Sequence, residues 1–214
     1  MPHSTFEKFL PAAGTLAGIL FAVTGYVAHT PDSASANPVT AMAGHETQNF
    51  IALIASALFV VMMAFFTVAI RQALRSGEPG ESTYSSAAFA GGVMVATVAA
   101  LNAWVMIALI DATGSKDVGT ARVLGTLGVD SWLPFMAAAA VLLLSTGLGG
   151  LRTAVLPRWL SIVTVVLGVC CLGGPTGFIV WFAMPVWLIA TSVVLVRRQS
   201  AETSAPRTAQ PVSA

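Results

Sequence analysis

The residues that could carry chemistry gather at the predicted ends of apolar segments, on one side of the chain. His29 follows the first apolar segment, and His45 and Glu46 precede the second. Asp111 ends the third segment and Asp130 precedes the fourth. Imidazole and carboxylate groups are ligands for zinc and related divalent ions. If these five side chains converge, they could form a metal site at the outer face of the protein.

The spacing of these residues matches no known metal or catalytic motif. No second histidine follows His45-Glu46 at HExxH spacing, and no phosphate-binding glycine loop, nucleophile elbow or CxxC pair occurs. Acidic residues at helix starts, such as Glu46 and Asp130, are also favoured by the helix dipole alone. We therefore expect ordinary helix ends more strongly than a metal site. The sequence predicts no cofactor and assigns no catalytic residue.

Polar side chains inside the apolar segments are the second set of candidates. Asn102 is the most polar of them, and an unpaired amide in hydrocarbon is energetically costly. We expect it to hydrogen bond to a neighbouring helix; the alternative is that it lines a polar cavity. Asn49, Ser56 and Met63 recur at seven-residue spacing and should face protein. Such a stripe fits intramolecular packing, and otherwise a dimer interface or a substrate path.

Helices that cross a membrane must position these residues. Of the 214 residues, 56% are hydrophobic and only 9% are charged, against about 25% charged in an ordinary soluble domain. The mean hydropathy is +0.83. The net charge is +1, without a basic cluster, so nucleic acid is not an expected partner. The sequence predicts an all-α, polytopic membrane protein.

Six apolar segments are candidates for transmembrane helices, which need about 20 residues each. The glycine- and proline-rich turn Gly173-Gly174-Pro175-Thr176-Gly177 divides the last apolar stretch into a helical hairpin, whose first helix is short and could be re-entrant. Residues 1–9 form a predicted N-terminal segment, and residues 199–214 a disordered tail. The predicted spans are residues 10–28, 47–70, 84–110, 131–150, 156–172 and 176–196.

The distribution of basic residues predicts the orientation of the six spans. Of the ten Lys and Arg residues, only Lys116 and Arg122 fall on the side opposite the termini. Because cytoplasmic loops of membrane proteins are enriched in Lys and Arg, we expect both termini in the cytoplasm. An even number of spans agrees with this distribution.

Small and amphipathic residues predict several contacts. Gly14 and Gly18 form a GxxxG pair on the first span, and Gly92 belongs to a small-residue ridge on the third, so both should allow close helix packing. Trp187 needs a partner for its indole N–H. In the loops, Asn37-Pro38 predicts the start of a short helix, and residues 121–127 predict a helical turn or two.

The C-terminal part resembles a family of uncharacterised actinobacterial membrane proteins with six spans. The residues concerned are Leu156-Pro157-Arg158-Trp159-Leu160, the Gly-Pro turn, Pro185-Val186-Trp187 and Arg197-Arg198. The resemblance covers most of the chain in layout and is specific over residues 156–198. It implies the fold and a bacterial cytoplasmic membrane, and it lends no catalytic residue.

Three classes of function remain open from the sequence. The leading hypothesis is a non-enzymatic membrane protein that binds lipid, a protein partner or a second copy of itself. The alternative is a small-solute transporter or channel whose path passes Asn102 and the Asn49–Ser56 stripe. A membrane enzyme with an outer-face metal site is the third. No ionisable residue lies at membrane depth, which argues against proton- or sodium-coupled transport.

Overall fold

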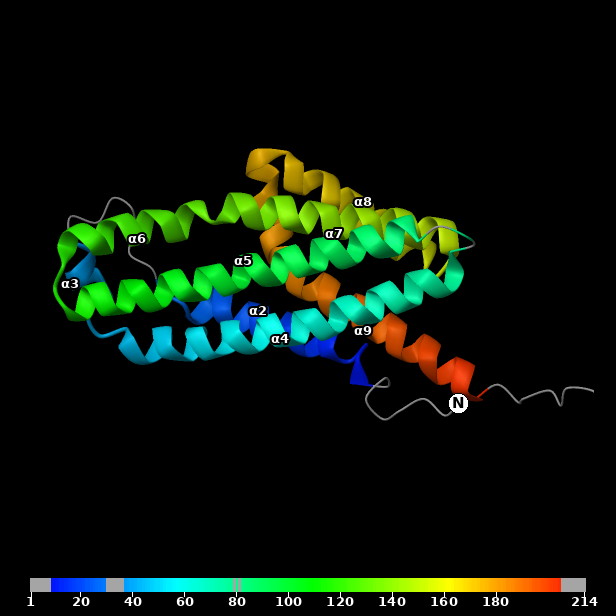
Figure 1. Cartoon of the computed structure of the whole chain (residues 1–214), viewed down its shortest axis with the longest axis horizontal. Coiled ribbons are helices and arrows are strands. Elements are labelled where there is room, and N and C mark those ends of the chain that lie inside the picture. Colours follow the sequence, from blue (N-terminus) through cyan, green and yellow to red (C-terminus); the bar gives the residue numbers. More distant parts are fainter. Residues whose placement is uncertain (1–8, 30–36, 79, 81, 205–214) are drawn as a thin grey trace, which may run out of the picture.

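The computed structural model describes residues 9–29, 37–78, 80 and 82–204, and every regular element among them is a helix (Figure 1). This confirms the predicted all-α fold class. The elements in chain order are α2 (Ala13–Val27), α3 (Pro38–Met42), α4 (Glu46–Gly77), α5 (Thr83–Gly114), α6 (Val118–Asp130), α7 (Trp132–Thr153), α8 (Arg158–Leu172), the 3₁₀ turn η1 (Gly174–Thr176) and α9 (Gly177–Ser204).

Within the described ranges, four helical segments are long and apolar enough to cross a membrane. They are Glu46–Gly77, Thr83–Gly114, Val118–Thr153, which joins α6 to α7, and Gly174–Ala201. The apolar helices α2 and α8 have 15 residues each, or about 22 Å at 1.5 Å per residue. That is shorter than the roughly 30 Å of bilayer hydrocarbon. Membrane length is therefore established for four of the six predicted spans.

The surface of the bundle is apolar around its middle. Large hydrophobic side chains are exposed on several helices, including Leu133 of α7, Val166 of α8 and Phe182 of α9. Water would disfavour so much exposed apolar surface, whereas lipid chains cover it without cost. Together with the four membrane-length helices, this surface is that of a membrane-embedded protein.

The two ends of the bundle differ in their charged residues. At one end, the turn from α4 to α5 meets the end of α7 (Figure 1), and the Arg152 guanidinium lies over the Tyr84 ring, 5.7 Å from its centroid. We call this the basic end; its arginines are Arg71, Arg75, Arg152, Arg158, Arg197 and Arg198. The opposite, distal end contains α3 and α6 (Figure 1). Both α4 and α5 have 32 residues, about 48 Å, so they extend beyond one hydrocarbon thickness.

Glycines allow the close helix contacts that the sequence predicts. A Cβ atom at Gly14 would overlap the Phe66 ring, and one at Gly92 would overlap Thr67. At Gly18 the nearest atom is the carbonyl oxygen of Pro185. These contacts join α2 to α4, α4 to α5, and α2 to α9.

The predicted inward-facing stripe on α4 is also confirmed. The exposed fractions are 0% for Asn49, 8% for Ser56 and 0% for Met63. The indole N–H of Trp187 donates a 2.8 Å hydrogen bond to Thr164 Oγ1 of α8, which supplies the partner that this side chain needs. Sequence periodicity and the cost of burying polar groups therefore predict these contacts correctly.

The connecting segments contain more helix than the sequence suggests. The short helix α3 begins as predicted, with Asn37 Oδ1 accepting from the Val39 N–H at 3.0 Å. In place of one or two turns at residues 121–127, α6 has 13 residues and is separated from α7 only by Ser131. The last helix continues past the predicted end at residue 196 to Ser204, because no proline interrupts the chain before Pro206. The rest of the predicted tail and residues 1–8 lie outside the described residues.

Candidate functional site

The structure brings two of the five outer-face candidates together. The His29 and His45 rings stack, with their centroids 3.9 Å apart and their planes 22° apart. The backbone N–H of His29 donates to Asn49 Oδ1 at 2.8 Å, and His45 Nδ1 hydrogen bonds to Gln48 Oε1 at 2.8 Å. The stack and the His29–Asn49 bond join the end of α2 to the start of α4, whereas the His45–Gln48 bond lies within the first turn of α4.

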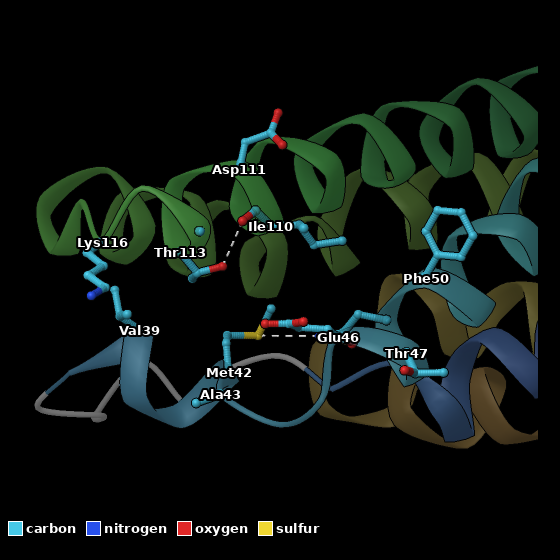
Figure 2. A pocket seen from close by; sticks show the side chains of 12 residues that line it. Val39, Met42, Ala43, Glu46, Thr47, Phe50, Ile110, Asp111, Thr113 and Lys116 are labelled. Atoms are coloured by element: carbon cyan, nitrogen blue, oxygen red, sulfur yellow. Dashed lines mark hydrogen bonds between the residues drawn. The ribbon is translucent and has the colours of Figure 1, made fainter.

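The three acidic candidates lie apart from this pair. Glu46 and Asp111 both line a cavity between α4 and α5, and the Asp111 carboxylate is directed away from Glu46 (Figure 2). Asp130 is exposed in the last turn of α6. Among the described residues, no three His, Cys, Asp or Glu side chains form a group that could hold a metal ion. The five candidates therefore do not make one site in this structure.

The cavity that Glu46 lines, which we call the outer cavity, has a volume of about 830 Å³. It lies between α3, the start of α4 and the end of α5, with Lys116 at one end and Phe50 at the other (Figure 2). In the described part of the chain, neither the Lys116 ammonium nor the Glu46 carboxylate pairs with another side chain. In addition to Asp111, the outer cavity therefore combines two unpaired opposite charges with an apolar end.

A second, inner cavity of about 240 Å³ lies between α2, α4, α5, α6 and Trp181 of α9. Three helices and one helix junction each supply a polar residue to it: Thr24 from α2, Ser56 from α4, Asn102 from α5 and Ser131 from between α6 and α7. Two of the packing contacts explain this convergence. Gly92 of α5 packs against Thr67 of α4. Asn102 is ten residues from Gly92 toward the distal end, which places it beside Ser56 of α4. Gly128 faces Val105, which brings Ser131 to the level of Asn102.

Most of these polar groups make no hydrogen bond to any residue that the structure describes. The Thr24 Oγ1 atom is buried without a hydrogen bond. Within the described residues, the side chains of Ser56, Asn102 and Trp181 likewise make none, and only Ser131 is satisfied, through a 2.6 Å bond to the Gly128 carbonyl. The predicted bond from Asn102 to a neighbouring helix is therefore absent. The alternative, that Asn102 lines a cavity, is what the structure contains.

An apolar layer separates the two cavities. Met42 lines the outer cavity and Leu109 the inner one, and both belong to a buried cluster with Ala112 and Ala121. The amide of Asn49 borders this layer, with Nδ2 3.6 Å from Met42 Sδ. The two polar residues of the α4 stripe therefore lie at different cavities, Asn49 at the outer and Ser56 at the inner one.

Aromatic rings close the inner cavity toward the basic end. Each of three polar residues has a phenylalanine about one helical turn closer to the basic end. The pairs are Thr24 with Phe21, Ser56 with Phe59, and Ser131 with Phe135. Phe21 contacts Phe59 and Phe135 at centroid distances of 5.5 Å and Trp181 at 4.9 Å. Trp181 lines the inner cavity, and the three phenylalanine rings pack against it or each other toward the basic end; we call these four rings the aromatic floor.

An apolar groove on the outside of α4 and α5 lies next to both cavities. Its volume is about 550 Å³. Phe50 lines both the groove and the outer cavity. Leu53 and Ala103 line both the groove and the inner cavity. These two side chains form the wall between the inner cavity and the lipid-facing surface.

No protein-family model, curated protein or solved structure matches this chain. The function must therefore be argued from the cavities themselves. Sequence reasoning missed Thr24, Trp181 and Lys116 as lining residues. The available signals were weak: a hydroxyl near the end of the first apolar segment, a tryptophan in the outer half of the last one, and one of the two basic residues on the distal side.

Proposed function

We propose that this protein binds a small, uncharged, largely apolar molecule with one hydrogen-bonding group in the inner cavity. The observation that carries the proposal is the convergence of unpaired polar groups from Thr24, Ser56, Asn102 and Trp181 on one cavity. Buried polar groups without partners are costly, especially where no bulk water reaches. A ligand with a hydroxyl or carbonyl group would satisfy them. This proposal keeps the non-enzymatic binding role of the leading hypothesis, with a small apolar molecule in place of a membrane lipid or a protein partner.

The lining of the inner cavity defines the chemical class of the ligand. None of the residues that line it is charged, and most are apolar, for example Leu53, Met106 and Leu124. A charged ligand would therefore lose its hydration without gaining an ion pair. A cavity of about 150 Å³ is known to hold benzene, so 240 Å³ suits a molecule of about two fused rings.

The aromatic floor favours binding over passage. Transport along the predicted path by Asn102 would require the rings of Phe21, Phe59, Phe135 and Trp181 to separate. It would also require Met42 and Leu109 to open toward the outer cavity. In the conformation described, a molecule in the inner cavity has no continuation toward the basic end.

The test is saturable binding of 2-naphthol to the full-length protein in mild detergent, measured by titration calorimetry, with naphthalene as the non-polar comparison. We expect one site per chain. Gly128→Leu should abolish binding, because the nearest atom to a Cβ there is 4.0 Å away and the side chain would fill the cavity. Asn102→Leu should weaken binding of 2-naphthol by about tenfold, the effect of one lost hydrogen bond, and leave binding of naphthalene nearly unchanged.

Gly119→Leu is the matched control, since it makes the same substitution on an exposed part of α6. Equal binding by the Gly128→Leu and Gly119→Leu variants would refute the proposal, as would a wild-type protein that never saturates. Solute flux through protein-containing liposomes that is lost in Asn102→Leu would favour the transport alternative.

A further inference from the structure

The groove on α4 and α5 has the dimensions of one lipid chain. Its lining is entirely apolar and includes Phe50, Leu53, Ile54, Val60, Ala100 and Trp104. Along α4 it extends from Phe50 to Val60, which corresponds to about 15 Å. That length is half of the roughly 30 Å hydrocarbon thickness, and so equals the depth of one leaflet. The groove lies on the outside of two membrane-length helices, where lipid chains are the molecules available to fill it.

The groove adjoins a polar cavity. Phe50 lines both the apolar groove and the outer cavity, and its side chain is 59% exposed. The opposite end of the outer cavity carries Lys116 (Figure 2). A molecule that follows this surface therefore passes from an apolar channel one leaflet deep to a charged compartment. This is the polarity profile of a phospholipid.

The charges in the outer cavity select among phospholipid headgroups. The Lys116 ammonium can donate to a phosphate, and the Glu46 carboxylate can accept from a primary ammonium group. Both lack a protein partner within the described residues. A headgroup that carries a phosphate and a primary ammonium matches both charges. A quaternary ammonium has no N–H to donate, and an anionic headgroup leaves Glu46 without a counter-charge.

We infer that the outer cavity and the groove together bind one phosphatidylethanolamine-type phospholipid. The headgroup lies in the outer cavity, where Lys116 can bind its phosphate and Glu46 its primary ammonium, and one acyl chain lies in the groove between α4 and α5. This site is separate from the inner cavity, from which Leu53 and Ala103 divide it. It takes a charged lipid, whereas the inner cavity excludes charge, so the inference does not depend on the proposed function.

Native mass spectrometry of the full-length protein in mild detergent tests this inference. Phosphatidylethanolamine, phosphatidylcholine and phosphatidylglycerol with identical acyl chains are added separately, and we expect one retained phosphatidylethanolamine per chain with at least about tenfold preference. Lys116→Gln should weaken retention of phosphatidylethanolamine and phosphatidylglycerol alike. Glu46→Gln should remove only the preference for phosphatidylethanolamine over phosphatidylglycerol. Glycerophosphoethanolamine, which has no acyl chains, should not bind.

Two tryptophan variants separate a defined groove from general lipid contact. Ala100→Trp fills the groove, whereas Ala137→Trp adds the same bulk to an exposed position of α7. Loss of phosphatidylethanolamine in the first variant only is the expected result. Equal retention by both variants, or equal retention of the three lipids by the wild-type protein, overturns the inference. Saturable binding of 2-naphthol by Lys116→Gln and Ala100→Trp would show that these variants fold. It would also show that 2-naphthol binding at the inner cavity can be measured separately from phospholipid binding.

Discussion

The imidazole rings of His29 and His45 stack where the end of α2 meets the start of α4, with 3.9 Å between their centroids. The neighbouring bond from the His29 N–H to Asn49 Oδ1, at 2.8 Å, holds the same junction. The two histidines therefore make a packing contact between two helix ends, which agrees with the expectation of ordinary helix ends rather than a metal site.

Removing the ring stack should loosen this junction. His45→Ala deletes one of the two stacked rings, whereas His45→Phe keeps an aromatic ring at the same position. Amide hydrogen exchange at the end of α2 should therefore be faster in His45→Ala than in the wild-type protein and nearly unchanged in His45→Phe. Equal exchange in the two variants would mean that the stack does not hold the junction.

Glycines at helix contacts and at cavities should respond oppositely to alanine. A Cβ at Gly91 would overlap the backbone of Leu142, which cannot move aside, so Gly91→Ala should cost about 1–3 kcal/mol through overpacking. At Gly128 the nearest atom is 4.0 Å away, and alanine also favours helix. Thermal unfolding in detergent should therefore show a lower Tm for Gly91→Ala and an equal or higher Tm for Gly128→Ala. Equal losses in both variants would contradict the contact geometry.

The hydrogen bond from Trp187 Nε1 to Thr164 Oγ1 should contribute measurably to stability. Both residues are buried, and Thr164→Val would leave the indole N–H unpaired, at a cost of about 1–3 kcal/mol. A double-mutant cycle with Trp187→Phe isolates the pair. We expect the double variant to be more stable than the sum of the two single losses predicts. Strict additivity would mean that the bond contributes nothing.

The cap of α6 should weaken in acid. Thr120 Oγ1 and the Thr120 N–H donate to the Asp117 carboxylate at 2.7 and 3.1 Å. These bonds, the side-chain one first, lower the pKa of Asp117 below its ordinary value of 3.8. The cap is thus fully formed above that value and lost as the pH falls through the lowered pKa. At neutral pH, hydrogen exchange in the first turn of α6 should be faster in Asp117→Ala than in Asp117→Asn, which keeps an amide oxygen for capping.

Sequence periodicity predicted the parts of the fold that repeat along a single helix. The stripe of Asn49, Ser56 and Met63 and the GxxxG pair report which face of a helix meets protein, and both face it here. The spacing of residues along one helix does not indicate which residue of a neighbouring helix lies opposite a given position. An asparagine inside an apolar segment is expected to make a structural hydrogen bond, yet the Asn102 side chain makes none with the described residues of the neighbouring helices.

The length of α6 was equally hard to predict. Gly119, Gly125 and Gly128 lower the helix propensity of this segment, so its local sequence favours a loop with one or two turns. Tertiary packing overrides that preference, because Ala121 buries itself against Ala112 of α5 in the distal cluster. The roof of the inner cavity, which α6 completes with Leu124, Gly125 and Gly128, therefore depends on contacts between segments.

The wall formed by Leu53 and Ala103 couples the two proposed sites thermodynamically. Each of these side chains touches the groove on one side and the inner cavity on the other, so an occupant that displaces either one changes the space left for the second ligand. Linkage then requires that the phospholipid alter the affinity for the inner ligand by the same factor as the inner ligand alters the affinity for the phospholipid. The lipid composition of the membrane would thus act as an effector of this protein.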